Sequence, residues 1–227
     1  MTRLGGLLIV AILTAVGAAG CDPKSAMVHR PENPSADAAV TAMWTREIHG
    51  VARDGDWILT RSYYAMGDAI ALATPGEDLS HASIYDATHD TVIEAVRDGV
   101  REIPLAQLVD RNHYVIVVRP SGMTAADQAQ ALGRARTKLG APFDITGMIC
   151  IDHADAYYCS ELVYWASQTE AHSGRRERVI TPADLMKYGE VIYWSGKRTD
   201  PQIMELATSR APRAPRTETA SARPAEP

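Results

Sequence analysis

The stretch 158–166 constrains the fold more than any other part of the chain, because it combines a cysteine with the spacing of an amphipathic helix. The apolar residues Leu162, Val163 and Ala166 recur at helical intervals, so one face of this helix is expected to be buried. Cys159 lies at the upstream end of that face, where backbone N–H groups lower the pKa of a thiol and can receive an oxyanion. The stretch therefore predicts a nucleophilic cysteine on a helix that packs against a core.

A thiol nucleophile needs a base, and His81 is the histidine in the most suitable context. It opens a predicted strand, 82–85, which a short turn connects to a second strand over 91–96. Glu94 lies within the second strand, and same-face side chains on neighbouring strands are about 5 Å apart. We therefore expect Glu94 to accept a hydrogen bond from one ring nitrogen and to leave the other facing the thiol. His113, which precedes a later strand, is a weaker candidate.

Two alternatives for Cys159 stay open at this point. In an oxidising compartment it can form a disulfide with Cys150, nine residues upstream. Cys150, His153 and Cys159 can also be grouped as metal ligands, but their spacing matches no familiar zinc pattern and a fourth ligand is not evident. We expect no metal and no other cofactor.

The order of the predicted elements indicates an α+β fold. Helices are expected over 37–48 and 124–139, the second one capped by Thr124 and Asp127 and stopped by Gly140. A further helix starts at Thr181 with a proline in its first position. Strands are predicted over 57–60, 82–85, 91–96, 99–104, 114–118 and 191–194, several of them paired as hairpins. These elements predict an antiparallel sheet packed against the long helix and the cysteine helix.

The first twenty residues are expected to be a signal peptide outside the fold. Arg3 precedes an apolar run over 7–16 that is too short to span a bilayer, and small residues lead directly to Cys21. This pattern is typical of a bacterial lipoprotein, with Cys21 as the acylated first residue of the mature chain; an ordinary secretory signal is the alternative. We expect residues 21–38 to be a tether, 39–204 the folded domain and 205–227 a disordered tail rich in proline, arginine and alanine. The mature protein would then be anchored to a membrane of the bacterial envelope and face the periplasm.

Charge and composition exclude one class of partner. The net charge is −5 at pH 7, so the chain lacks the basic footprint of a nucleic-acid-binding protein. Apolar residues make up 46% of the chain and charged residues 22%, which is ordinary for one globular domain of this length.

Six short motifs follow one another along the chain: Asp54-Gly55-Asp56, Ser80-His81-Ala82, Val92-Ile93-Glu94-Ala95, and the stretches 138–144, 158–163 and 181–185. In this order they resemble the permuted papain-like hydrolases, in the YiiX/YaeF-like branch of the NlpC-like superfamily, over roughly residues 50–195. The resemblance implies a circularly permuted papain-like fold, which explains why the histidine precedes the cysteine. It also implies that Cys159 is the nucleophile, His81 the base and Glu94 the orienting acid.

The chain departs from the family pattern in places. Phe143 replaces the tyrosine that usually precedes the aspartate of the fourth motif, and the resemblance supplies no role for Cys150. Beyond the backbone N–H of the nucleophile, Tyr63, Tyr64 and Tyr158 are candidates to complete an oxyanion hole.

The function expected from these observations is thiol-dependent hydrolysis of an amide at the cell envelope. The substrate is a peptide, a peptidoglycan stem peptide, an acyl-amino acid or a lipid amide. Two alternatives remain. One is an acyltransferase or phospholipase-like enzyme of the lecithin retinol acyltransferase type, which carries histidine instead of Glu94. The other is a binding lipoprotein without catalysis, which an intact set of Cys159, His81 and Glu94 disfavours.

Overall fold

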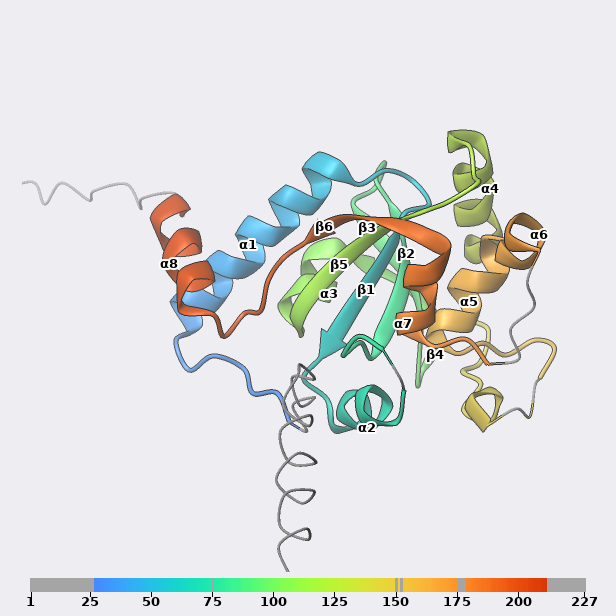
Figure 1. Ribbon diagram of the computed structural model, residues 1–227, viewed down its shortest axis with the longest axis horizontal. Helices are drawn as coiled ribbons and strands as arrows, with labels where there is room; N and C mark the ends of the chain where they lie inside the picture. The colour runs from blue at the N-terminus through green and yellow to red at the C-terminus, as the bar shows by residue number, and fades with distance from the viewer. Residues whose placement is uncertain (1–26, 75, 150, 152, 175–178, 212–227) are drawn as a thin grey trace, which may run out of the picture.

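The fold is built on one antiparallel sheet of six strands in the order β4-β3-β2-β1-β5-β6 (Figure 1). The computed structural model describes residues 27–211 except 75, 150, 152 and 175–178. The strands are β1 (Trp57–Ser62), β2 (His81–Asp86), β3 (Thr91–Val96), β4 (Gly99–Pro104), β5 (Asn112–Pro120) and β6 (Gly189–Trp194). Every neighbouring pair is antiparallel, as the hairpin pattern predicted.

Helices cover both faces of this sheet. They are α1 (Pro34–Val51), α2 (Ala65–Ala73), α3 (Leu105–Asp110), α4 (Ala125–Arg136), α5 (Cys159–Ala166), α6 (Thr169–Ser173), α7 (Pro182–Leu185) and α8 (Pro201–Arg210), with short 3-10 turns at Gly147–Ile149 and Met186–Tyr188. Helices α1, α3 and α8 lie on one side and α4 to α7 on the other (Figure 1). Among the described residues, no helix is long and apolar enough to cross a membrane.

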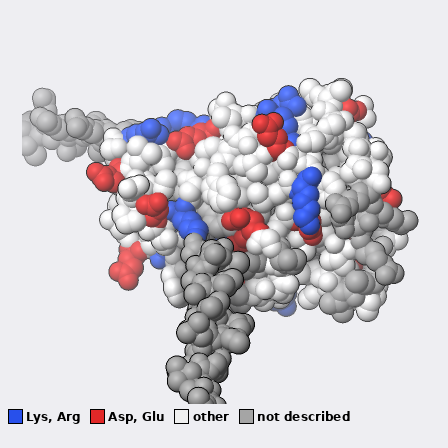
Figure 2. Space-filling model, in the orientation of Figure 1, with Lys and Arg blue, Asp and Glu red and all other residues white. Residues whose placement is uncertain are grey.

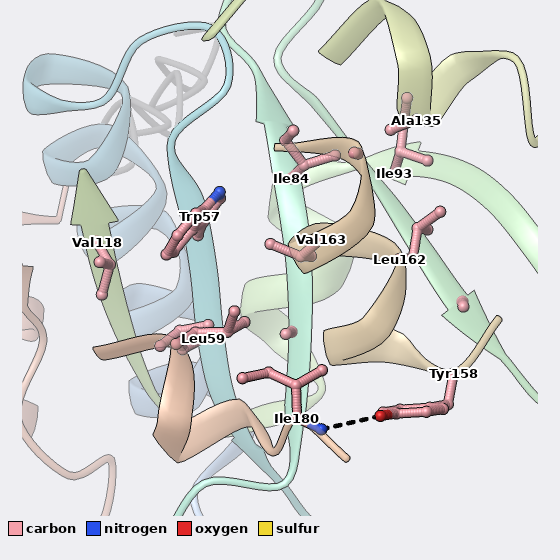
Figure 3. Packing of buried hydrophobic residues seen from close by; sticks show 14 of the residues in the cluster. Trp57, Leu59, Ile84, Ile93, Val118, Ala135, Tyr158, Leu162, Val163 and Ile180 are labelled. Carbon is pink, nitrogen blue, oxygen red and sulfur yellow. Dashed lines mark hydrogen bonds between the residues drawn. The ribbon is translucent and has the colours of Figure 1, made fainter. Parts of the chain in front are cut away.

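The sheet separates two hydrophobic cores, because side chains alternate along each strand. Trp57 and Leu59 of β1 face the first core, together with α4, α5 and α7. Ile58, between them, faces the second core under α1 and α3. Figure 3 shows the first core, where Leu162 and Val163 of α5 lie over the sheet near Ile84. A strand buried on both faces explains the continuous apolar runs in the sequence.

Most predicted elements are present with small shifts at their ends. Strands β3 and β4 have the predicted bounds, and β5 extends beyond both ends of the predicted 114–118. Thr124 and Asp127 form the predicted capping box of α4, and Thr181 and Asp184 form one at α7. Helix α4 ends at Arg136, not at 139, because the chain turns over the next residues before Gly140 takes a φ of 86°.

Helices extend beyond both of the expected domain limits, residues 39 and 204. Helix α1 begins at Pro34 within the expected tether, because the side chain of Asn33 accepts the N–H groups of Ser35 and Ala36. Helix α8 continues to Arg210 within the expected tail, because Ala207 is buried in the second core. The leader, Cys21 and the chain after residue 211 lie outside the described residues.

Helices α2, α6 and α8 were not predicted. Helix α2 is the one next to the start of β2, and it buries only Gly67 and Ala71. Gly67 is required there by packing, because a Cβ at this position would come within 2.1 Å of the Ser62 hydroxyl oxygen and 3.1 Å of that of Ser80. Helix α2 therefore lies directly against the residue that precedes His81.

Candidate active site

Cys159 occupies the first position of α5, as predicted. Tyr158 is the N-cap residue, and its backbone N–H donates to Oε2 of Glu161 at 3.1 Å, which helps to fix the start of the helix. Leu162 and Val163 are fully buried, and each contributes roughly 1.5–3 kcal/mol of hydrophobic stabilisation to holding α5 on the sheet. Cys159 is a free thiol with an exposed fraction of only 7%. A rigid, packed helix thus places its sulfur.

His81 begins β2 and contacts Glu94 of β3. The β2–β3 pairing ends at Ser83 and Glu94, so Glu94 is a diagonal neighbour of His81 and not its direct partner. A glutamate is long enough to bridge a diagonal separation, and Oε2 of Glu94 lies 2.7 Å from Nε2 of His81. The predicted contact is therefore present. Nδ1 is left as the ring nitrogen available to the thiol.

Electrostatics in this site favour a thiolate beside an imidazolium. Burial alone lowers the pKa of His81, but hydrogen bonds to Cys159 and Glu94, and their charges, raise it to about 9. Burial alone raises the pKa of Cys159, but the hydrogen bond and charge of His81 bring it below the ordinary value. The backbone N–H groups of Ala82 and Ser160 also hydrogen-bond the sulfur and act in the same direction. Both shifts therefore act toward a nucleophilic thiolate beside a protonated imidazole.

Two arginines that the sequence reasoning missed hold Glu94. Burial alone raises the pKa of this fully buried carboxyl group, but His81, Arg111 and Arg101 together lower it to about 2. Arg101 donates from Nε to Oε1 at 2.9 Å, and Arg111 donates from Nη2 to Oε2. A signal for Arg101 was available, because the two-residue turn after Val96 places it directly opposite Glu94. No local signal points to Arg111, which caps α3.

Asp144 of the fourth motif organises the loop that leads to the nucleophile. Its carboxylate is buried and accepts the backbone N–H groups of Thr146, Gly147 and His153. Desolvation alone raises the pKa of this carboxyl group, but these hydrogen bonds lower it below its ordinary value. Asp144 is therefore a structural residue in the loop that leads to α5, and Phe143 beside it packs against the first core.

The other candidates lie in different settings. His113 is buried in β5, its ring packs edge-on against Tyr63, and burial lowers its pKa to about 4. The hydroxyl of Tyr158 accepts the N–H of Ile180 at 3.0 Å (Figure 3), so it is engaged within the core. Tyr64 is 60% exposed at the start of α2. These positions identify none of the candidate tyrosines, Tyr63, Tyr64 and Tyr158, as an oxyanion donor.

The alternatives for Cys159 depend on Cys150, which lies outside the described residues. His153, the third member of the suggested metal group, is exposed. Within the described part of the chain, no three His, Cys, Asp or Glu side chains are grouped so that they could hold a metal ion.

Comparison with known families gives the same picture as the motifs. The model of the permuted papain-like amidase enzymes, YaeF/YiiX, C92 family, matches residues 51–204. The chain belongs to this family. It is therefore an enzyme of the hydrolase class with a permuted papain-like fold, as the motifs and the antiparallel sheet indicated. The YaeF/YiiX match begins at the last residue of α1, so most of that helix lies outside it.

Among solved structures, the chain is similar to the crystal structure described as the metalloprotein yiiX from Escherichia coli O157:H7. The two share 28% sequence identity, with a TM-score of 0.45, over 55% of this chain and 68% of the other. No curated protein matches the chain.

Proposed function

We propose that this protein hydrolyses amide bonds through a covalent thioester on Cys159, with His81 as acid and base and Glu94 as the orienting acid. The observation that carries the proposal is the chain of contacts from the sulfur through the imidazole to the Glu94 carboxylate. This is the arrangement that activates a thiol nucleophile. Membership of an amidase family supports the bond type.

The chemistry follows from these positions. The thiolate of Cys159 attacks the amide carbonyl, and the charge that develops on its oxygen is stabilised by N–H donors at the start of α5. The imidazolium of His81 then donates its proton to the leaving nitrogen, so that the amine departs and a thioester remains. Neutral His81 next takes a proton from water, whose oxygen attacks the thioester. The acid leaves, and the thiolate–imidazolium pair is restored when the proton stays on His81.

Glu94 supports each of these steps without touching the substrate. Its hydrogen bond to Nε2 fixes the orientation of the His81 ring, and its negative charge stabilises the imidazolium. Because Glu94 is fully buried, water does not screen this interaction. The carboxylate therefore keeps the base oriented through the whole cycle.

The proposed substrates are a peptide, a peptidoglycan stem peptide or a small acyl-amino acid. The proposed location is the bacterial envelope, facing the periplasm, with the chain anchored by acylation of Cys21, the first residue after a lipoprotein leader. On the face seen in Figure 2, acidic and basic side chains form small separate groups. A substrate recognised through one large field of a single charge is not indicated on that face.

The test is to trap the thioester. We would incubate the protein with a panel of muropeptides and acyl-amino acids, quench with acid, and measure the mass of the Cys159 peptide. Wild type and Cys150→Ala should both cleave a substrate and carry the acyl adduct on Cys159, whereas Cys159→Ala should do neither. Cleavage by Cys159→Ala at the wild-type rate would refute the mechanism.

A further inference from the structure

One oxygen of Glu94 is shared between two cationic partners. Oε2 accepts from Nε2 of His81 at 2.7 Å and also from Nη2 of Arg111, while Oε1 accepts from Nε of Arg101 at 2.9 Å. The Glu94 side chain is fully buried, and that of Arg111 is only 15% exposed. The contact between Arg111 and the oxygen that His81 uses is thus largely shielded from solvent.

From this geometry we propose that Arg111 is a positioning residue that sets the acid strength of His81 by sharing Oε2 of Glu94 with it. The inference deepens the proposed function and rests on it for its catalytic meaning. The guanidinium repels the imidazolium across the shared oxygen, and this repulsion disfavours the protonated form of His81.

Sharing of Oε2 between Arg111 and His81 matters because His81 has two roles in the proposed reaction. The imidazolium must be stable enough to keep Cys159 as a thiolate, yet acidic enough to protonate a leaving amine. Glu94 alone would stabilise the protonated form of His81 too strongly, because the charge of a buried carboxylate with no other partner attracts an imidazolium strongly. The positive charge of Arg111 at the same carboxylate oxygen opposes this effect.

The fold holds Arg111 in this position. It follows α3, whose residues Leu105, Leu108 and Val109 are fully buried in the second core. Asp110 beside it pairs with Arg30 at 2.6 Å, so this acidic neighbour is engaged elsewhere. The arginine therefore reaches Glu94 from a fixed backbone.

The charged groups around His81 come from four elements. Glu94 on β3 and Cys159 on α5 contact His81 directly, whereas Arg101 on β4 and Arg111 after α3 contact Glu94. Arg101 binds the oxygen that His81 does not use and is 40% exposed, so water screens its charge. Arg111 is accordingly the arginine expected to tune the histidine.

The test is an NMR titration of His81 in the full chain labelled at its histidines, with the signal assigned by its loss in His81→Ala. The midpoint is expected near pH 9 in wild type. Arg111→Met should move this midpoint upward by about one pH unit, because the repelling charge is lost. Glu94→Gln should move it downward. Arg111→Lys, which keeps the charge, should leave the midpoint within a few tenths of a pH unit of wild type. Arg111→Gln, which keeps an N–H donor without the charge, should also move it upward.

Arg119→Met is the matched control. Arg119 pairs at 2.8 Å with Asp56, another fully buried carboxylate, at the opposite end of β1 from the His81 pairing. Arg119→Met should lower the melting temperature of the protein and leave the titration midpoint of His81 unchanged. An unchanged or lowered midpoint in both Arg111→Met and Arg111→Gln would overturn the proposal. Because the titration needs no substrate, its result is independent of whether amide hydrolysis is found.

Discussion

The ion pair between Asp37 and Arg198 makes a strong prediction about where the domain begins. Asp37 lies in the first turn of α1, and its Oδ1 accepts from Nη1 of Arg198 at 2.8 Å. The Arg198 side chain is fully buried and that of Asp37 is 5% exposed. Arg198 also donates to the backbone carbonyls of Val109 and Asn112, so it ties α1 to α3 and β5. We expect Asp37→Ala to destabilise the whole domain.

The magnitude follows from the burial of the pair. Removing one partner of a buried ion pair leaves an uncompensated charge and costs about 3–5 kcal/mol. Each kcal/mol lowers the melting temperature of a protein of this size by about 2–4 °C. Asp37→Ala should therefore melt roughly 6–20 °C below wild type, as measured by circular dichroism or calorimetry. A chain that starts at residue 39 lacks the same carboxylate and should be destabilised at least as much.

Arg30→Ala provides the matched control, because Arg30 binds the same carboxylate from the solvent side. Its Nε lies 2.5 Å from Oδ2 of Asp37, but its side chain is 46% exposed. Exposed pairs contribute about 0–1 kcal/mol, so this variant should melt within a few degrees of wild type. If Asp37→Ala also loses less than about 1 kcal/mol, the argument that α1 is an integral part of the domain is wrong.

Four further outcomes are expected. Iodoacetamide should alkylate Cys159 well below pH 8 and faster than Cys150, as read by peptide mass spectrometry, and labelling of both thiols at the same slow rate would contradict an activated thiol. Glu94→Gln should keep the fold and lower turnover by roughly ten- to a thousand-fold; full activity would show that another group orients His81. The pKa of Glu94, about 2 instead of the ordinary 4.5, corresponds to about 3 kcal/mol of stability present above pH 4.5 and lost as pH falls toward 2, measurable by urea denaturation at each pH. Cys21→Ser should abolish incorporation of an alkyne fatty acid and release the protein from membranes in high salt, and no label on wild type would mean an ordinary secretory signal.

Local patterns were sufficient for most of the fold. Alternating and apolar runs located the strands, and capping residues located the starts of α4 and α7, because these signals act within a few residues. The helix of Cys159 and the hairpin that brings His81 to Glu94 were predicted for the same reason. The register between β2 and β3 was not predicted. Ser83 pairs with Glu94, so His81 is a diagonal neighbour of Glu94, and strand periodicity alone cannot specify this offset.

The errors concern contacts between residues far apart in sequence. The polar, proline-bearing stretch up to residue 38 has the composition of a linker, but its last residues form the first turn of α1, where Asp37 pairs with the buried Arg198. Arg111 lies 17 residues from Glu94, and its role depends on how α3 packs. A sequence pattern reports the periodicity of one element, whereas these contacts arise when elements meet.

The active site itself forms where the two layers of the fold meet. Cys159 comes from α5 in the first core, together with Ala82 and Ile93. By strand alternation, His81 and Glu94 lie on the other face of the sheet, that of Tyr85 and the second core. The pairing of β2 with β3 ends at Ser83. Ala82, the residue before it on β2, donates its backbone N–H to the sulfur of Cys159 at this end of the sheet. The nucleophile and its base thus depend on opposite helical layers, so a change that loosens either layer should separate them even when it lies far from both.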